Sequence, residues 1–453
     1  MSLLTRDIRA TWRLAAPLIG GHLAQQLIGM TDTLMLGRYG VLELAAGGLG
    51  AMVYFVIFIG GSGLGLAVLP LVAAAAVAGN VTQARRITRM GMWLSVCVAA
   101  LAMPVFWFSG PLLLALGQEP EIAAGAQSYL RIAGTAMVFS LLGFTLKNHL
   151  AALEHVQVAL WSTLAAAGLN AVMNYLLIFG HFGLPELGLR GAAIATLGTQ
   201  ALICVILALY AARAHGLSEY RLFQRLWRPD WSAMGQVLRL GAPIGGTQLA
   251  ETGLFAASTL MMGWISTLHL AAHGVALQIA SVTFMAHVGL SSAATVRAGQ
   301  AWTRADAQGL GRAALSALCL SGLFVLLTVA AFLGLPEVLI EVFLDRDEPQ
   351  RPAIVVIGVG LLALAALFQL ADAAQVMAMG LLRGLQDTSV PLLIALTSYW
   401  LIGLPAMYAM AFILDWGATG VWLGLVVGLV PAGLLLSARF WGKLRGLAAI
   451  SPA

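Results

Sequence analysis

The chain has 453 residues, of which 60% are hydrophobic and only 9% are charged, and its formal net charge is +5. An ordinary soluble domain carries roughly 25% charged residues, so this composition excludes a soluble protein. Residues 92–116 and 353–371 contain no charge at all, and about 20 such residues span a bilayer. Lipid leaves the backbone no water to bond with, and the alternating pattern of a membrane barrel is absent. We therefore expect an all-α integral membrane protein.

Charged or Gly/Pro-rich breaks divide the chain into twelve apolar segments. The first six lie near residues 14–37, 46–76, 90–117, 127–150, 156–180 and 190–213. The second six lie near residues 233–264, 271–296, 311–334, 352–382, 389–414 and 417–440. The longest polar linker separates the two sets. The sequence thus predicts two pseudo-symmetric six-helix bundles, with an N-terminal lobe over residues 1–213, a cytoplasmic linker over 214–232 and a C-terminal lobe over 233–453.

An internal repeat supports this division. A shift of 226 residues superposes Pro17 on Pro243 and continues without a gap to Gly48 over Gly274. Six spans is an even number, so both halves start on the same side of the membrane. We expect parallel repeats related by an axis along the membrane normal, with the substrate bound between the halves near the midplane.

The distribution of basic residues predicts the orientation. With both chain ends inside the cell, 19 of the 24 lysines and arginines lie on the cytoplasmic side. The five on the outer side are Arg38, Arg131, Arg190, Arg346 and Arg351. The positive-inside rule then predicts a multi-pass protein of the bacterial cytoplasmic (inner) membrane with both termini cytoplasmic. Because the basic residues lie in short loops between spans, we expect no nucleic-acid partner.

Two carboxylates lie deep within apolar segments of the second half. Glu251 follows Arg239 by 12 residues, which places it about 18 Å from that end of the helix. Asp372 precedes Arg383 by 11 residues, or about 16 Å. A central Asp costs about 3 kcal/mol on insertion scales, so such residues indicate function.

These two carboxylates, Glu251 and Asp372, are the predicted cation-binding pair. The sequence shows no embedded Lys or Arg at the same depth, so a proton or a mobile cation is expected to neutralise them. Hard carboxylate oxygens also suit Na⁺, which makes the pair a candidate metal site. The alternative is that each carboxylate only bonds to neighbouring helices.

A second candidate group, for proton or substrate coupling, lies in the first half. Asp32 is six residues from Arg38, about 9 Å below the outer end of its helix, so a partly hydrated interfacial Asp is the alternative. Asn170 and Asn174 are spaced i, i+4 and can offer two amides to one partner, or simply join helices. Thr196 and Gln278 are weaker candidates of the same kind.

The glycine-rich run Gly60–Gly65 suggests a phosphate loop only at first sight. It lies within an apolar segment and lacks the Lys-Ser/Thr ending, so close helix packing is the better interpretation. The sequence contains no Walker, HExxH or GxSxG motif. This argues against an ATP-driven pump and against common hydrolases, so we expect no enzyme activity, no cofactor, and an ion gradient as the energy source.

Three stretches resemble the multidrug and toxic compound extrusion (MATE) family, in its NorM-like branch. They are residues Thr31–Gly40, Ala250–Ala256 and Ala371–Thr388. The resemblance implies a secondary active exporter of organic, mostly cationic and amphiphilic drug-like compounds, which takes in Na⁺ and/or H⁺ by alternating access. It also implies a cation site at Glu251 and Asp372.

By the same resemblance, Asp32, Asn170 and Asn174 form a protonatable cluster, and Asn174 stands where the DinF-like branch often has Asp. We expect a monomer in the lipid bilayer. Two alternatives from the same sequence are a lipid-linked precursor flippase, which the acidic embedded charges disfavour, and a membrane enzyme using Asp32 or Asp372. A passive channel is a third.

Overall fold

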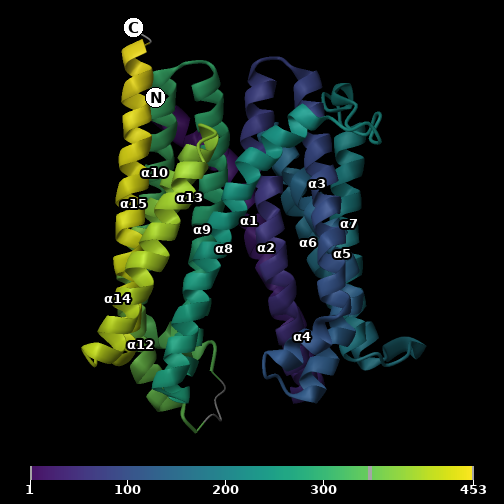
Figure 1. Cartoon of the computed structure of the whole chain (residues 1–453), viewed down its shortest axis with the longest axis vertical. Coiled ribbons are helices and arrows are strands. Elements are labelled where there is room, and N and C mark those ends of the chain that lie inside the picture. The colour runs from purple at the N-terminus through teal and green to yellow at the C-terminus, as the bar shows by residue number, and fades with distance from the viewer. Residues whose placement is uncertain (1–2, 345–348, 451–453) are drawn as a thin grey trace. The chain divides into compact units, whose positions relative to one another are not determined.

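The computed structural model describes residues 3–344 and 349–450, which form α-helices with short 3₁₀ and π segments and contain no β-strand. The chain divides into two compact units (Figure 1). The first unit is Gly20–Gly245, and the second unit combines residues 1–19 with residues 246–453.

The first unit contains most of α1 and the start of α8, together with the complete helices between them. The bounds are α1 Leu3–Tyr39, α2 Val41–Val77, α3 Val81–Trp107, α4 Ser109–Ala115, α5 Pro120–Ala152, α6 Gln157–Phe179, the 3₁₀ turn η1 His181–Gly183, α7 Leu189–Arg213, the 3₁₀ turn η2 Ser218–Tyr220 and α8 Trp231–Ile265.

The second unit contains the start of α1, the rest of α8 and all later helices. The bounds are α9 Thr267–Thr303, α10 Ala307–Gly334, α11 Pro336–Glu341, α12 Arg351–Gly384, α13 Ser389–Leu396, the π segment η3 Thr397–Gly403, α14 Leu404–Tyr408, the π segment η4 Ala409–Ile413 and α15 Gly417–Ile450.

The predicted all-α fold with twelve spans is confirmed. Within the described residues the spans are α1, α2, α3, α5, α6, α7, α8, α9, α10, α12, the continuous run from α13 to η4, and α15. Ten of them are long and apolar enough to cross a membrane by composition alone. The other two, α1 and α8, are more polar and carry Asp32 and Glu251.

Several helices extend beyond the predicted apolar segments. The first helix begins at Leu3 and not near residue 14, α5 begins at Pro120 and not near 127, and α15 continues to Ile450 and not to 440. Hydropathy marks the part of a helix that lies in hydrocarbon, whereas the hydrogen-bonded backbone continues into water. The predicted span 90–117 is in fact α3 followed by the short α4, because the backbone leaves the helical region at Phe108.

The two units exchange the starts of their leading helices. The division falls between Ile19 and Gly20 in α1 and between Gly245 and Gly246 in α8, which are equivalent positions under the 226-residue shift. Residues before Gly20 pack within the second unit, where the Thr11 and Ser316 hydroxyls hydrogen-bond at 2.8 Å. The predicted lobes 1–213 and 233–453 follow chain order and stay a prediction. The compact units differ from them by these helix starts.

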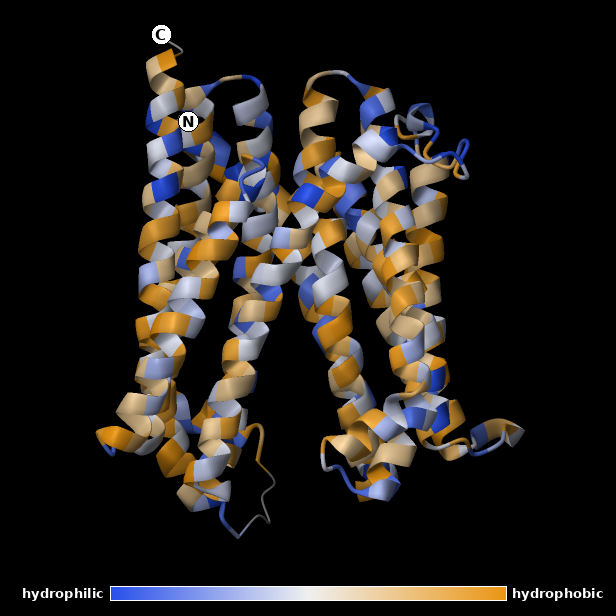
Figure 2. Ribbon diagram, in the orientation of Figure 1, coloured by the Kyte–Doolittle hydropathy of each residue, from blue (hydrophilic) through white to orange (hydrophobic). Residues whose placement is uncertain are grey.

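Both ends of the described chain belong to the second unit and lie at the same end of it (Figure 1). An even number of spans requires this. Figure 2 shows hydrophilic residues concentrated near the helix ends and connections, with largely apolar stretches between them. This pattern is the one that a bilayer imposes on a helical bundle.

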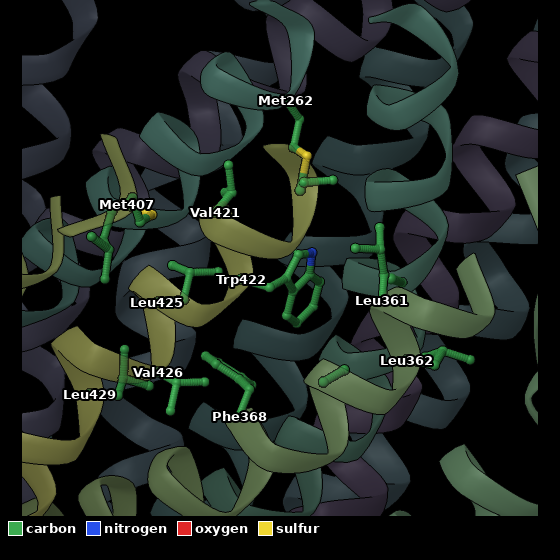
Figure 3. Packing of buried hydrophobic residues seen from close by; sticks show 14 of the residues in the cluster. Met262, Leu361, Leu362, Phe368, Met407, Val421, Trp422, Leu425, Val426 and Leu429 are labelled. Atoms are coloured by element: carbon green, nitrogen blue, oxygen red, sulfur yellow. The ribbon is translucent and has the colours of Figure 1, made fainter. Parts of the chain in front are cut away.

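The core of the second unit is built around Trp422, which is fully buried (Figure 3). Its ring lies edge-on to Phe368, with centroids 5.9 Å apart, and to His273 at 5.7 Å. Leu361 and Leu425 belong to the same buried cluster. Aromatic pairs at these separations pack favourably, so this core fixes α9, α12 and α15 against one another.

The glycine-rich run of α2 is confirmed as a packing surface. A Cβ atom at Gly63 would collide with the backbone of Gly245, and one at Gly241 would lie 2.7 Å from Leu64 Cα. Only residues without side chains allow two helix backbones to approach so closely within a bundle.

Candidate ion-coupling sites

Asp372 lies on α12 in the second unit and is 1% exposed. Neither of its carboxylate oxygens has a hydrogen-bond partner among the described residues. A buried charge without partners costs several kcal/mol, so this carboxyl group needs either a proton or a bound cation.

Glu251, on α8, lies close enough to Asp372 for the two carboxylates to repel each other. Gln375 joins the pair, because its Nε2 donates a long hydrogen bond of 3.4 Å to Glu251 Oε1. Its own Oε1 is buried without a partner. Gln375 lies one helical turn after Asp372, which puts the two side chains on the same face of α12. Three unpartnered oxygens, from Asp372 and Gln375, thus accompany the Glu251 carboxylate.

Arg383 corrects one part of the sequence analysis. We expected no embedded Arg or Lys near the carboxylate pair, but Arg383 interacts electrostatically with Glu251. A long side chain in the last turn of α12 can direct its charged end back along the helix, which residue spacing does not reveal. Its described hydrogen bond is to the Met379 sulfur at 3.5 Å. Arg383 therefore offsets the charge of Glu251, whereas Asp372 keeps no such partner.

Two contacts of Trp400 hold the π segment η3 against α8 next to Glu251. Trp400 Nε1 donates a 3.2 Å hydrogen bond to the carbonyl of Ala250, and Gly253 leaves room for its ring, because a Cβ there would lie 2.7 Å from Trp400 Cζ2. Trp400 and the fully buried Tyr399 lie in the π segment η3. Tyr399 also lies near both carboxylates. Such π segments often occur at functional sites.

The first unit holds the second candidate site. Asp32, on α1, accepts hydrogen bonds at Oδ1 from Asn170 Nδ2 at 3.0 Å and from Asn174 Nδ2 at 2.5 Å. Asn174 Nδ2 also contacts Asn170 Oδ1 at 3.2 Å, and both asparagines on α6 are fully buried. The structure thus brings the two asparagines of the i, i+4 pair to one partner, Asp32, as the family resemblance implied. Asp32 thus has two amide donors, whereas Asp372 has none among the described residues.

Thr196 and Gln278 were the weaker candidates. Thr196 Oγ1 donates to the Ala192 carbonyl of its own helix at 3.0 Å. Thr196 also lies beside the Tyr129 hydroxyl, which in turn lies near Asp32. Thr196 is thus connected to Asp32 through Tyr129. Gln278 lies half-buried on α9 of the second unit and has no described hydrogen bond to Glu251 or Asp372.

Comparison with known proteins decides the family. The sequence profile of the MatE family matches residues 17–176 and again residues 243–409. The two matches begin 226 residues apart, the same shift as the internal repeat. The chain belongs to the MatE family.

Curated relatives cover almost the whole MatE chain. A probable multidrug resistance protein NorM of Rhizobium meliloti is 45% identical over 98% of this chain and 95% of its own. Proteins of the same description are 37% identical in Brucella suis, over 99% and 96%, and 38% identical in Pseudomonas aeruginosa, over 96% and 90%. These relatives support the NorM-like branch within the MatE family.

Solved structures agree on the fold of this MatE chain. A eukaryotic MATE transporter, AtDTX14, superposes with a TM-score of 0.86 at 20% identity and covers 98% of this chain and 99% of its own. A multidrug resistance MATE family transporter in an outward-facing conformation gives 0.89 at 19% identity, over 98% and 97%. At this identity the likeness shows the fold alone.

Four neighbours of the candidate sites were missed by sequence reasoning: Gln375, Arg383, Tyr399 and Tyr129. Gln375 carried a usable signal, because it is a polar residue one turn from Asp372 in an apolar helix of this MatE chain. Tyr129 and Tyr399 had none, since a tyrosine within a span is usually a packing residue.

Proposed function

We propose that this protein is a secondary active multidrug exporter that expels organic, mostly cationic and amphiphilic compounds in exchange for Na⁺ and/or H⁺ by alternating access. The observation that carries the proposal is Asp372, a buried carboxylate whose two oxygens have no hydrogen-bond partner among the described residues. A passive pore or a purely structural helix gains nothing from such a costly group. The names of the curated NorM relatives support the same activity.

The proposed cation site consists of Glu251 and Asp372. Either a proton or Na⁺ can satisfy them: a proton neutralises one carboxylate, and Na⁺ prefers hard oxygens such as those of Asp372 and Gln375. Arg383 already offsets part of the negative charge near Glu251. We therefore assign the coupling ion primarily to Asp372.

Asp32, Asn170 and Asn174 are proposed as the coupling group of the first unit. Two amide donors stabilise the ionised carboxylate, which prepares it to attract an organic cation or a proton. Cation uptake at the carboxylates would weaken drug binding, and linkage requires drug to weaken cation binding by the same factor.

The setting that we propose is the bacterial inner membrane, with both termini in the cytoplasm and the protein acting as a monomer. The count of basic residues on each side supports this orientation. The proposal includes no catalytic reaction, no cofactor and no nucleic-acid partner, since the gradient supplies the energy and the substrate leaves unchanged.

The test is efflux of a fluorescent organic cation from proteoliposomes that contain the purified protein, with Na⁺ and pH gradients imposed separately. We expect movement under at least one gradient, and its loss in Glu251→Gln and Asp372→Asn. Movement that ignores both gradients and both substitutions would refute the exporter and favour a channel or a flippase. Chemical change of the dye would favour an enzyme.

A further inference from the structure

A cavity of about 760 Å³ lies in the first unit beside the linker between α7 and α8, away from both candidate ion sites. Six arginines and one carboxylate line it. The arginines are Arg85, Arg86 and Arg89 of α3 and Arg221, Arg225 and Arg228 of the linker, and the carboxylate is Asp230. We name this the arginine pocket. Figure 2 shows hydrophilic residues over the same linker.

The linker is fixed against α3 by specific bonds, so the pocket has a defined shape. Trp93 Nε1 donates to the Leu226 carbonyl at 2.7 Å, and Arg89 Nη1 donates to the Arg225 carbonyl at 3.2 Å. Farther along, Arg86 forms an ion pair with Asp230. These contacts hold the two rows of arginines facing a common space.

The positive charge of the pocket is left largely uncompensated. Asp230 is already used by Arg86 and by the backbone N–H of Ala233, to which its Oδ1 is 3.1 Å away. None of the other five arginines forms an ion pair within the part of the chain that the structure describes. Arg89 is only 7% exposed, and its Nε is buried without a hydrogen-bond partner. A buried, partly unsatisfied guanidinium beside like charges is a favourable position for an anion.

The positive-inside rule explains why basic residues occur here, but it does not explain why they remain unpaired around a cavity. Two basic clusters of the second unit are paired with carboxylates and can be compared with the pocket. There Arg297 and Arg312 pair with Asp7, and Arg439 and Lys443 pair with Asp387. Those two basic clusters are each compensated by a carboxylate, and the arginine pocket differs from them in this respect.

We propose that the arginine pocket binds a phosphate-bearing anion with at least two negative charges. Planar guanidinium groups match phosphate oxygens in bidentate geometry, and several of them around one cavity favour a diphosphate or a two-phosphate head group. Two exposed indoles adjoin it, Trp227 at 78% and Trp231 at 73% exposure. Tryptophan at the polar boundary of a bilayer is typical of lipid contact, so an anionic phospholipid head group is the source that these neighbours favour.

The test uses the delipidated full-length protein in a neutral detergent. Inorganic pyrophosphate is titrated by calorimetry, and cardiolipin is counted by native mass spectrometry with phosphatidylethanolamine as the zwitterionic control. The probe variant replaces Arg221, Arg225 and Arg228 by Gln. The matched control replaces the exposed Arg9, Arg304 and Arg445 of the second unit, which removes the same charge elsewhere.

We expect at least tenfold weaker binding in the probe variant and less than twofold change in the control, with affinity that falls as salt is raised. If only cardiolipin binds, the ligand is a lipid head group; if only pyrophosphate binds, the ligand is a soluble phosphate compound. Either result supports the proposed anion site.

If neither probe binds the wild type, or both triple variants lose binding equally, the proposal is wrong. The single variant Arg225→Gln, with a melting curve to verify folding, keeps the test decisive if the triple variant is unstable. None of these readouts depends on drug efflux.

Discussion

The two units each carry acidic residues inside the membrane, but they treat them in opposite ways. In the first unit, Asp32 receives two amide hydrogen bonds from α6. In the second, Asp372 has none within the described residues, and its neighbour is another carboxylate. A satisfied carboxylate can stay ionised by itself, whereas an unsatisfied one requires a cation or a proton. The same fold, used twice, thus holds one carboxylate with two amide donors and one without any described donor.

Equivalent positions of the two repeats differ in where the acidic residue stands. Under the 226-residue shift, Asp32 corresponds to Ser258, and Glu251 corresponds to Gln25. The acidic residues of the two repeats therefore differ by seven positions in the repeat. Seven positions are about two helical turns, so both acidic residues lie on nearly the same face of their helices. Ser258 contacts His273 and donates to the Phe255 carbonyl, so the equivalent of Asp32 became part of the core.

The largest effect is expected at Asp372. Asp372→Asn keeps the shape but removes the charge, so gradient-driven efflux from proteoliposomes should fall at least a hundredfold. The matched control is Asp415→Asn, an exposed residue in a turn of the same unit, which should retain full efflux. Comparable efflux in Asp372→Asn and the control would remove the unsatisfied carboxylate from the mechanism.

A smaller loss is expected at the satisfied site. Asn174→Ala removes one of two donors to Asp32, and a lost hydrogen bond to a charged group costs about 1.5–3 kcal/mol. We expect efflux to fall roughly tenfold or more, measured as the initial rate at saturating gradient. Asp32→Asn should be more severe than Asn174→Ala. The reverse order would show that the asparagines serve packing and not the carboxylate.

A third prediction concerns Gln375, the neighbour of Asp372 on α12. Gln375→Leu removes an unpartnered amide oxygen beside Asp372, so the cation concentration that gives half-maximal efflux should rise about three- to tenfold, consistent with one weak ligand. Gln369→Leu is the comparison on the same helix: its amide oxygen is also buried without a partner, but its Nε2 donates to Thr283 and not to Glu251. Equal shifts in both variants would indicate a general loss of polarity in α12.

The smallest effect lies outside the membrane, at Asp230. The hydrogen bond from Arg86 holds the pKa of this carboxyl below its usual value. Asp230→Asn keeps the bond to Ala233 but loses the ion pair, which should cost about 0.5–1 kcal/mol of stability at pH 7. Because the folded pKa is depressed, the difference should persist above about pH 4 and vanish as the pH falls further. Thermal unfolding in detergent across this range measures it, and a gap that widens in acid would contradict the assignment.

The sequence predicted the positions of polar residues along the helices better than it predicted their neighbours. Glu251 and Asp372 lie inside long helices, as expected, and i, i+4 spacing brought Asn170 and Asn174 to one partner. It did not predict that Arg383 reaches Glu251, because the path of a long side chain depends on what packs around it. Nor did hydropathy reveal the break at Phe108 or the π segment that holds Tyr399, since both follow from contacts between helices.

The most direct test of the central claim counts the ions that drug displaces. Purified protein in detergent is loaded with radioactive Na⁺ in weakly buffered solution, drug is added, and released Na⁺ and released protons are both counted. Linkage predicts that the wild type releases one of these cations on drug binding and that Asp372→Asn releases none, while Asp415→Asn behaves as the wild type. Release from Asp372→Asn equal to that of the wild type would contradict the account.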